Sequence, residues 1–162
     1  MDSGATTIDI LLNNGGIDEL RIEDDGCGIM KEDFPLLCER FATSKLTHFS
    51  DLQSIATYGF RGEALASIAA VSKTTLTTKD QNSDDPLGTR VIYKHGAHTS
   101  TEAVACTIGT TIEVADLFAT LPVRKTFLKQ DETEFPEGEY TIEVIIRKSP
   151  AYQTKFHVEE KP

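Results

Sequence analysis

Two stretches of this sequence combine glycines with charged side chains at a spacing suited to ligand binding. Residues 58–65 read Tyr-Gly-Phe-Arg-Gly-Glu-Ala-Leu, with Arg61 between Gly59 and Gly62, directly before an alanine-rich apolar run. Glycines let the backbone approach a bulky ligand, the amides at a helix start favour an anion, and a guanidinium group suits phosphate. Glycines before a helix are also a common packing and turn device, so these residues alone leave both interpretations open.

The second stretch, Asp24 to Ile29, places a carboxylate ahead of Gly26 and Gly28 at the end of an expected strand. A backbone that bends tightly around a ligand and a solvated acidic turn both fit this pattern. The stretch lacks the alternating oxygen ligands and the closing glutamate of an EF-hand loop. The sequence has no P-loop, no nucleophile elbow, no HExxH zinc motif and no complete dinucleotide-binding fingerprint, which excludes those classes of site.

The composition is that of a single globular domain with a strong negative charge. The chain has 162 residues, a formal net charge of -10 and no tryptophan. This charge argues against a surface that coats nucleic acid as a whole, although Arg124, Lys125 and Lys129 form a weak candidate for a local basic patch. The three cysteines stand alone, so we expect neither a zinc site nor a disulfide framework, as fits a reduced intracellular compartment. We predict no secretory signal and no membrane-spanning run.

The elements that must position the two stretches are mostly strands. Alternating apolar residues predict a β-hairpin around residues 8–22, further strands at 74–79, 88–93, 99–104 and 109–114, and a last strand at 152–158. Short helices are expected at 50–56 and 64–71, and residues 140–148 fit either a helix or a strand. An amphipathic helix is predicted over 31–42, with its apolar positions in the core: Phe34, Leu37, Cys38 and Phe41.

The order of these features resembles the GHKL ATPases, the superfamily shared by type II topoisomerase ATPase domains, Hsp90 chaperones, sensor histidine kinases and MutL. Residues 39–45 and 58–67 look specifically like MutL and its eukaryotic homologues in DNA mismatch repair, and residues 116–129 are similar to the segment leaving that ATPase domain. The resemblance implies an α+β fold. This fold is a two-layer α/β sandwich of the GHKL (Bergerat) type, with a mixed, mostly antiparallel sheet and helices on one face.

The same resemblance implies an ATP site with Mg²⁺ as its metal. Asp24 would accept a hydrogen bond from the adenine amino group, Gly26 and Gly28 would let the loop pass the base, and Ile29 would supply an apolar wall. Thr110 would support the adenine contact, directly or through water. The remaining implied site residues belong to a mobile segment over the nucleotide and to a phosphate cradle with its helix start: Thr43, Ser44 and Lys45, then Gly59, Phe60, Arg61, Gly62, Glu63, Ala64 and Leu65.

The sequence departs from the family pattern at its first motif. The first family motif reads Glu, three residues, Asn, two residues, Asp, and supplies the general base and the Mg²⁺-binding asparagine. Asp2 matches its last residue, so we expect the other two ahead of Met1 and assign no catalytic or metal-binding residue in this chain. Residues 1–130 are expected to form the ATPase domain without its first strand and helix. Residues 131–162 are expected to be a connector and the start of a truncated second domain.

Two functions remain open. The first is the ATP-binding portion of a MutL-type mismatch repair protein, intracellular, and nuclear in a eukaryote or in the cytoplasm or nucleoid of a bacterium. Its partners through the full-length protein would be a MutL-type homo- or heterodimer partner, a MutS-type mismatch-recognition protein and DNA, bound without sequence specificity. The alternative is a catalytically silent nucleotide-binding or interaction module without the general base. Residues 39–45 and 58–67 weigh against another GHKL member such as a chaperone or a kinase.

Overall fold

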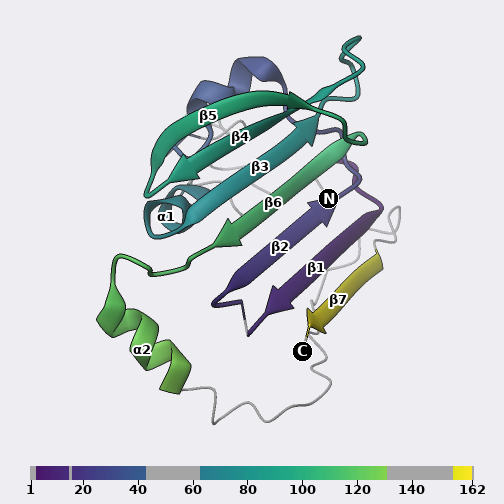
Figure 1. Cartoon of the computed structure of the whole chain (residues 1–162). Coiled ribbons are helices and arrows are strands. Elements are labelled where there is room, and N and C mark those ends of the chain that lie inside the picture. The colour runs from purple at the N-terminus through teal and green to yellow at the C-terminus, as the bar shows by residue number, and fades with distance from the viewer. Residues whose placement is uncertain (1–2, 15, 43–62, 131–154, 162) are drawn as a thin grey trace, which may run out of the picture.

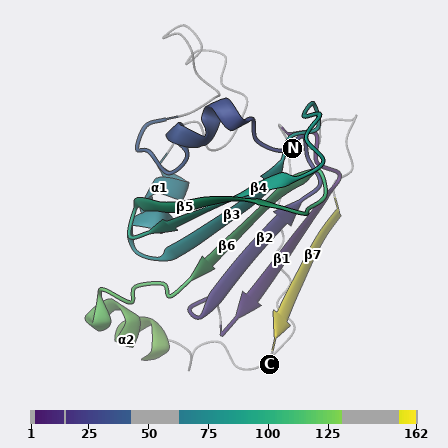
Figure 2. The same cartoon turned by 45° about the horizontal axis from the view of Figure 1, so that its top comes forward.

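The computed structural model describes residues 3–14, 16–42, 63–130 and 155–161, and these residues build one sheet with helices beside it (Figures 1 and 2). The seven strands lie in the order β5-β4-β3-β6-β2-β1-β7. The strands are β1 (Thr7–Asn13), β2 (Glu19–Asp24), β3 (Lys73–Lys79), β4 (Gly88–Lys94), β5 (Ala97–Val104), β6 (Gly109–Ala115) and β7 (Lys155–Lys161). The helical elements are the 3-10 helix η1 (Lys31–Leu36) and the α-helices α1 (Ala64–Ala70) and α2 (Pro122–Gln130).

Strand pairing confirms the predicted fold class and the predicted strands. Five of the six neighbouring pairs are antiparallel, and β7 joins β1 in parallel, so the sheet is mixed and mostly antiparallel. The hairpin between β1 and β2 turns where the asparagine-glycine run predicted it. Asn14 and Gly16 both have positive φ there, at 51° and 84°, a conformation that asparagine and glycine adopt at low cost.

One face of the sheet is apolar and carries the helices. Directly paired residues of antiparallel strands point to the same face, so the register defines rows of side chains across the sheet. One such row contains Ile22, Ile112, Leu76 and Val91, and the next contains Leu20, Val114, Thr74 and Tyr93. Leu76, Val91 and Val114 are buried, so the core lies between these rows and the helices.

The helix layer rests on the β3–β4 side of this face. Helix α1 contacts β3 and β4, and its Ala69 packs with Val91 and Tyr93. Residues 34–38 cover the same cluster from outside, and the Tyr93 hydroxyl donates to the Phe34 carbonyl at 3.4 Å. Burial raises the pKa of the Cys38 thiol to about 11, so it stays a neutral core side chain. The predicted helix at 64–71 is thus confirmed.

The predicted amphipathic helix over residues 31–42 is wrong beyond its first turns. The structure has the 3-10 helix η1, which ends at Leu36, and turns after it. Pro35 removes an amide donor inside the segment, and Cys38 and Phe41 both have left-handed backbones, with φ of 64° and 66°. Phe34, Leu37 and Cys38 still reach the core as predicted. Phe41 does not, because its side chain is 71% exposed.

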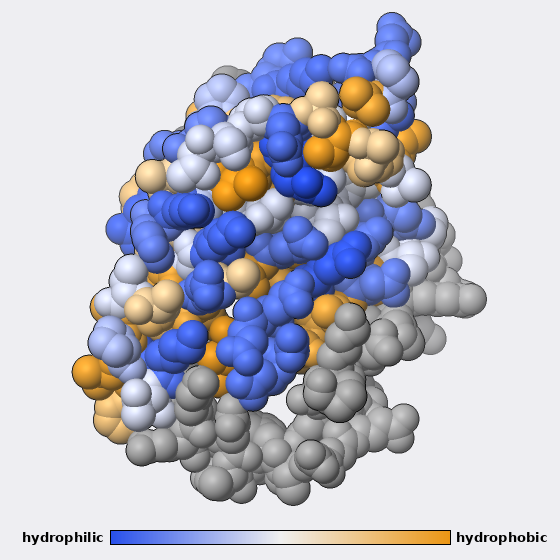
Figure 3. Space-filling view, in the orientation of Figure 1, coloured by the Kyte–Doolittle hydropathy of each residue, from blue (hydrophilic) through white to orange (hydrophobic). Residues whose placement is uncertain are grey.

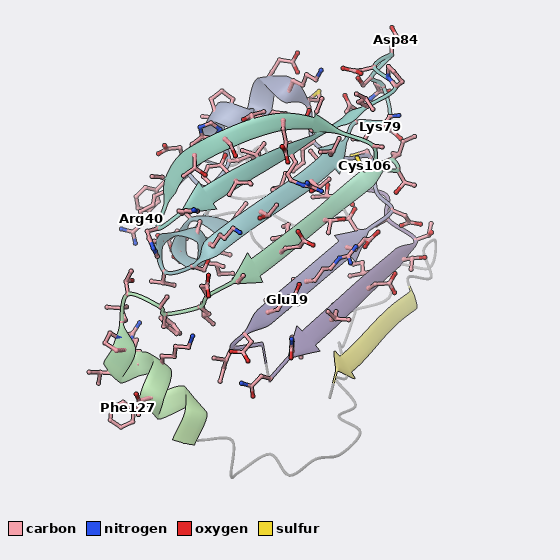
Figure 4. The ribbon with its side chains drawn as sticks, viewed as in Figure 1. Glu19, Arg40, Lys79, Asp84, Cys106 and Phe127 are labelled. Carbon is pink, nitrogen blue, oxygen red and sulfur yellow. The ribbon has the colours of Figure 1, made fainter. Side chains whose placement is uncertain are left out.

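The opposite face of the sheet is polar, as Figure 3 shows by the hydrophilic side chains spread across the strands. Glu19 on β2 points out from this face (Figure 4). The register forms a row of Glu23, Thr111, Thr77, Arg90 and Glu102. Ion pairs link side chains on this face. The guanidinium of Arg90 lies 3.1 Å from the carboxylate of Glu102, and that of Arg21 lies 2.6 Å from the carboxylate of Glu23. Exposed pairs of this kind contribute little stability, so the charges mainly keep this face solvated.

The last two elements lie at the rim of the sheet. Helix α2 stands beyond the end of β6, and Phe127 projects from it with 65% of its area exposed (Figures 1 and 4). This helix was not predicted, and it carries the predicted basic cluster at residues 124–129. Strand β7 confirms a last strand within 155–158 and extends it to Lys161. Because β7 joins the same sheet, residues 155–161 add an edge to the first domain here. The division into domains at residue 130 stays a prediction.

Truncating Leu76 to alanine should destabilise the fold more than the same change at an exposed leucine. Leu76 is fully buried in the inner strand β3, whereas Leu36 is 56% exposed at the end of η1. Loss of buried methyl groups and the cavity that remains cost about 2–5 kcal/mol for Leu76→Ala, against less than about 1 kcal/mol for Leu36→Ala. Urea denaturation followed by circular dichroism measures both. Equal losses would contradict the placement of the core.

Candidate functional site

At one end of the apolar face, a row of polar side chains replaces the apolar ones. Asp24 ends β2 and pairs with Thr110 on β6, which pairs with Thr78 on β3, which pairs with Thr89 on β4. The three threonines are buried, at 2% to 9% exposure. Buried hydroxyls need hydrogen-bond partners, and a polar row on the helix side of an otherwise apolar sheet face is a candidate site. This row brings the predicted site residues Asp24 and Thr110 side by side.

The loop that follows Asp24 is held at several points by hydrogen bonds. The Gly26 amide donates to Asp24 Oδ1 at 2.9 Å, which closes the bend. The Cys27 amide donates to the Ser3 carbonyl at 2.9 Å, and the Cys27 carbonyl accepts from the Gln81 amide at 2.9 Å. The loop is therefore a fixed element of the structure, and the interpretation of residues 24–29 as a solvated acidic turn does not describe it.

Two glycines are required here because other residues would collide with the backbone. Gly28 has a φ of 76°, and a Cβ placed on it would lie 2.1 Å from the Lys79 carbonyl oxygen. Gly109 has a φ of 129°, and its Cβ would lie 2.1 Å from the Asp24 carbonyl oxygen. The second glycine of the Asp-x-Gly-x-Gly loop thus serves close packing against β3. Gly109 serves the close approach of β6 to the strand end that carries Asp24.

Asp25 points away from the polar row and fixes the start of β1. Its carboxylate accepts hydrogen bonds from the Thr6 amide at 2.7 Å, the Thr6 hydroxyl at 2.5 Å and the Thr7 amide at 2.8 Å. These bonds, the Thr6 hydroxyl foremost, lower the pKa of Asp25 below its ordinary value of 3.8. The two adjacent aspartates therefore have separate tasks, since Asp25 holds β1 against the loop while Asp24 joins the row.

Thr78 is the residue that sequence reasoning missed. Its hydroxyl lies 3.0 Å from the Ile29 amide, 2.9 Å from the Gly109 carbonyl and 3.1 Å from the Thr110 hydroxyl. It therefore joins the end of the loop to β3 and β6. The period of two along β3 could have placed Thr78 on the buried face with Leu76, where a threonine at a strand end demands a partner. From the sequence, residues 74–79 are predicted only as a strand, with no site residue assigned to it.

The remaining predicted site residues divide between the described part of the chain and the rest. Asp24, Gly26, Gly28, Ile29 and Thr110 gather at one end of the sheet. Glu63 is the N-cap of α1, and Ala64 and Leu65 open that helix, which packs on the same face as the polar row. The other predicted residues lie outside the described residues, so their roles stay predictions: Thr43, Ser44, Lys45, Gly59, Phe60, Arg61 and Gly62.

A depression of about 270 Å³ opens on the polar face of the sheet, bordered by Arg21, Glu23 and Arg90, among others. Asp24 and Thr110 also border it. Their side chains belong to the opposite face, however, because Thr110 reaches Thr78 Oγ1 there. We therefore place the candidate site on the helix side, at the polar row, and not in this depression.

Among the residues that the structure describes, no group of three or more His, Cys, Asp or Glu side chains is arranged to hold a metal ion. The helices within those same ranges include none with the length and hydropathy needed to cross a bilayer. All three cysteines are free thiols.

The sheet with helices on one face and the Asp-x-Gly-x-Gly loop at its polar end define an ATPase domain of the GHKL class. Residues 1–117 match the family described as histidine kinase-, DNA gyrase B- and HSP90-like ATPase, and the protein belongs to that family.

Within this class, the protein is similar to mismatch repair proteins. It is 44% identical over 151 residues to the DNA mismatch repair protein MutL of Syntrophus aciditrophicus, which covers 93% of this chain and 24% of that protein. It is 49% identical over 148 residues to the DNA mismatch repair protein MLH1 of Saccharomyces cerevisiae, covering 88% of this chain and 19% of that protein. The Aquifex aeolicus MutL ATPase domain complexed with ADP superposes with a TM-score of 0.57 at 28% identity, covering 82% of this chain and 44% of that one. The chain spans about a quarter or less of the two curated relatives.

Gly28→Ala should destabilise the protein far more than Gly96→Ala. Both glycines have left-handed backbones, with φ of 76° and 81°, but a Cβ at Gly96 would meet nothing closer than Ala70 Cα at 3.6 Å. Backbone strain alone costs on the order of 1–2 kcal/mol at Gly96, and the clash with the Lys79 carbonyl should raise the cost at Gly28 to about 2–5 kcal/mol. Denaturant titration compares the two variants. Similar losses would show that the loop is not packed against β3.

Asp25→Asn should change how stability depends on pH. Because the folded pKa of Asp25 is depressed, the ionised carboxylate contributes stability that is present above the ordinary value of 3.8 and is lost as the pH falls through the lower folded pKa. The difference in unfolding free energy between the natural protein and the variant should therefore be constant above about pH 5 and shrink at lower pH. Thr6→Val should remove part of the same dependence. If the difference in unfolding free energy between the two proteins stays constant from about pH 2 to about pH 6, this assignment is wrong.

Proposed function

We propose that this chain is the ATP-binding portion of a MutL-type DNA mismatch repair protein. The observation that carries the proposal is the pairing of Asp24 with Thr110 at the polar end of an otherwise apolar sheet face, next to a loop that two glycines hold in place. The similarity to MutL and MLH1 proteins over most of the chain, and to a MutL ATPase domain that binds ADP, supports the same assignment.

The chemistry of the polar row suits an adenine base. A carboxylate only accepts hydrogen bonds when it is ionised, and the exocyclic amino group of adenine only donates them. Asp24 Oδ1 already accepts from the Gly26 amide, which leaves Oδ2 for a ligand. Guanine has an oxygen where adenine has this amino group, so the carboxylate would select between the two bases. Ile29 at the end of the loop would supply apolar contact with the base, and Gly26 would let the base lie close to the backbone.

The phosphates would extend from the base toward the helix layer. The implied phosphate-binding residues lead directly into α1, whose start at Ala64 lies on the same face as the polar row. Mg²⁺ would accompany the phosphates, as the resemblance implies. When bound, it would supply positive charge that neutralises the charge developing on the phosphates.

The activities of the whole protein are part of the proposal. ATP binding and hydrolysis would couple to dimerisation with a MutL-type partner and to signalling with a MutS-type protein on DNA, inside the cell. The chain covers only a minor part of its relatives, and a domain that binds ATP without turnover is the alternative. Measuring hydrolysis alongside binding separates the two, because the alternative expects binding alone.

Asp24→Asn should weaken ATP binding while leaving the loop folded. The asparagine keeps an oxygen that can accept from the Gly26 amide, so the bend at 2.9 Å can persist. Its amide group replaces the second acceptor by a donor, which would face the donating amino group of adenine. We expect the Kd for ATP to rise at least about tenfold, since a charged hydrogen bond contributes about 1.5–3 kcal/mol. Isothermal titration calorimetry with ATP and GTP measures this change.

Asp25→Asn is the matched control because it removes the neighbouring carboxylate, which binds Thr6 and Thr7 instead of joining the row. It should leave the preference for ATP over GTP intact. If the natural protein binds neither nucleotide, or if both aspartate variants change ATP affinity equally, the proposed adenine site is wrong.

A further inference from the structure

The hydroxyl of Thr78 is the centre of a hydrogen-bond network whose direction can be worked out. A threonine hydroxyl has one proton to donate and two lone pairs that accept. The Ile29 amide at 3.0 Å can only donate to it, and the Gly109 carbonyl at 2.9 Å can only accept from it. The single proton of Thr78 therefore points to Gly109, and one of its lone pairs is taken by Ile29.

This arrangement determines the proton of Thr110. The second lone pair of Thr78 faces the Thr110 hydroxyl at 3.1 Å. Thr78 has no proton left for that contact, so Thr110 must donate its own. The reverse arrangement, with Thr78 donating to Thr110, would give up the 2.9 Å bond to the Gly109 carbonyl. Because Thr78 is 2% exposed, the surrounding protein keeps the network away from solvent. Losing a hydrogen bond inside the protein is costly because water cannot replace it.

We infer that Thr78 is a specificity-determining positioning residue, which holds the Thr110 hydroxyl as a hydrogen-bond acceptor beside the Asp24 carboxylate. This inference rests on the proposed function and deepens it. Directly paired residues of antiparallel strands have Cβ atoms about 4.5–5.5 Å apart, so Asp24 and Thr110 can read one edge of the same ligand.

Two hydrogen-bond acceptors side by side favour a base edge that carries hydrogen-bond donors. An exocyclic amino group has two N–H donors, whereas a 6-oxo group would place its lone pairs against those of Thr110. Thr78 therefore contributes to selecting 6-amino purines without touching the base. A residue with a purely structural role would affect all purine nucleotides alike.

Thr78→Val tests this inference with ATP and ITP, whose base has the 6-oxo group and no 2-amino group. Valine removes the acceptor for the Thr110 proton, so Thr110 becomes free to donate to a 6-oxo group. The ratio of Kd for ITP to Kd for ATP should fall about threefold to tenfold in the full 162-residue chain. Thr78→Ser keeps the hydroxyl and should keep the ratio of the natural protein.

Thr74→Val is the matched control. Thr74 is buried on the same face of the same strand, but its hydroxyl contacts Ser72 at 2.9 Å and not the loop. Thr74→Val should therefore leave the ratio unchanged, even if it lowers stability. A ratio that falls in Thr78→Val alone supports the inference, and a ratio that is unchanged in Thr78→Val, or that falls equally in Thr74→Val, overturns it.

Thr78→Ala decides the matter if Thr78→Val does not fold, because alanine also removes the acceptor for the Thr110 proton. It should lower the same Kd ratio, and an unchanged ratio contradicts the inference. If the natural protein binds ATP but the ratio does not change in these variants, the proposed function stands and only the role of Thr78 is wrong. If the natural protein does not bind ATP at all, both are wrong.

Discussion

The site depends on buried hydroxyls satisfying one another at the end of an apolar sheet face. Thr78, Thr110 and Thr89 lie where β3, β6 and β4 would otherwise continue the core, and burial of unpaired hydroxyls there would cost stability. For Thr78 and Thr110 the network meets this demand with the loop amide of Ile29 and the carbonyl of Gly109. The same contacts that make the row stable also hold the loop against the sheet.

The glycines of this region serve the backbone before they serve any ligand. Gly28 and Gly109 each stand where a Cβ would meet a carbonyl oxygen of a neighbouring segment at 2.1 Å. Because these glycines lack side chains, the loop, β2 and β6 can lie close enough together for the hydroxyl network to form. The sequence pattern predicts close approach of this loop to a nucleotide, and the structure shows that the same glycines serve close approach of backbone to backbone.

The sequence predicted the strands and named two of the residues, Asp24 and Thr110, that the structure pairs at the candidate site. Alternation identifies β1 to β6 because one face of the sheet is buried and the other is polar. The spacing of Phe34, Leu37 and Cys38 correctly indicated core positions but wrongly indicated a long helix, since a single Pro35 and two left-handed residues decide the backbone there. Helical periodicity reports burial and cannot report such local interruptions.

Long-range pairing was the part that the sequence could not supply. Asp24 and Thr110 are recognisable from motifs, but only the register shows that they are direct partners with Thr78 next in the row. Alternation along β3 puts Thr78 on the buried face, yet its three contacts come from segments 31 to 49 residues away.

The net charge of the chain implies that the proposed site would hold the base and the phosphates by different kinds of contact. With a net charge of -10, the protein repels a nucleoside triphosphate at long range, so steering by its overall field cannot provide the affinity. In the proposed site, Thr110 and Asp24 would bind the base by accepting short-range hydrogen bonds, whose strength depends on burial and direction. Compensation of the phosphate charge would then fall to local donors, and Arg61 is the predicted cation for it. A site divided in this way should discriminate between bases at any salt concentration and lose affinity, rather than selectivity, as salt rises, since screening weakens charge interactions and leaves buried hydrogen bonds in place.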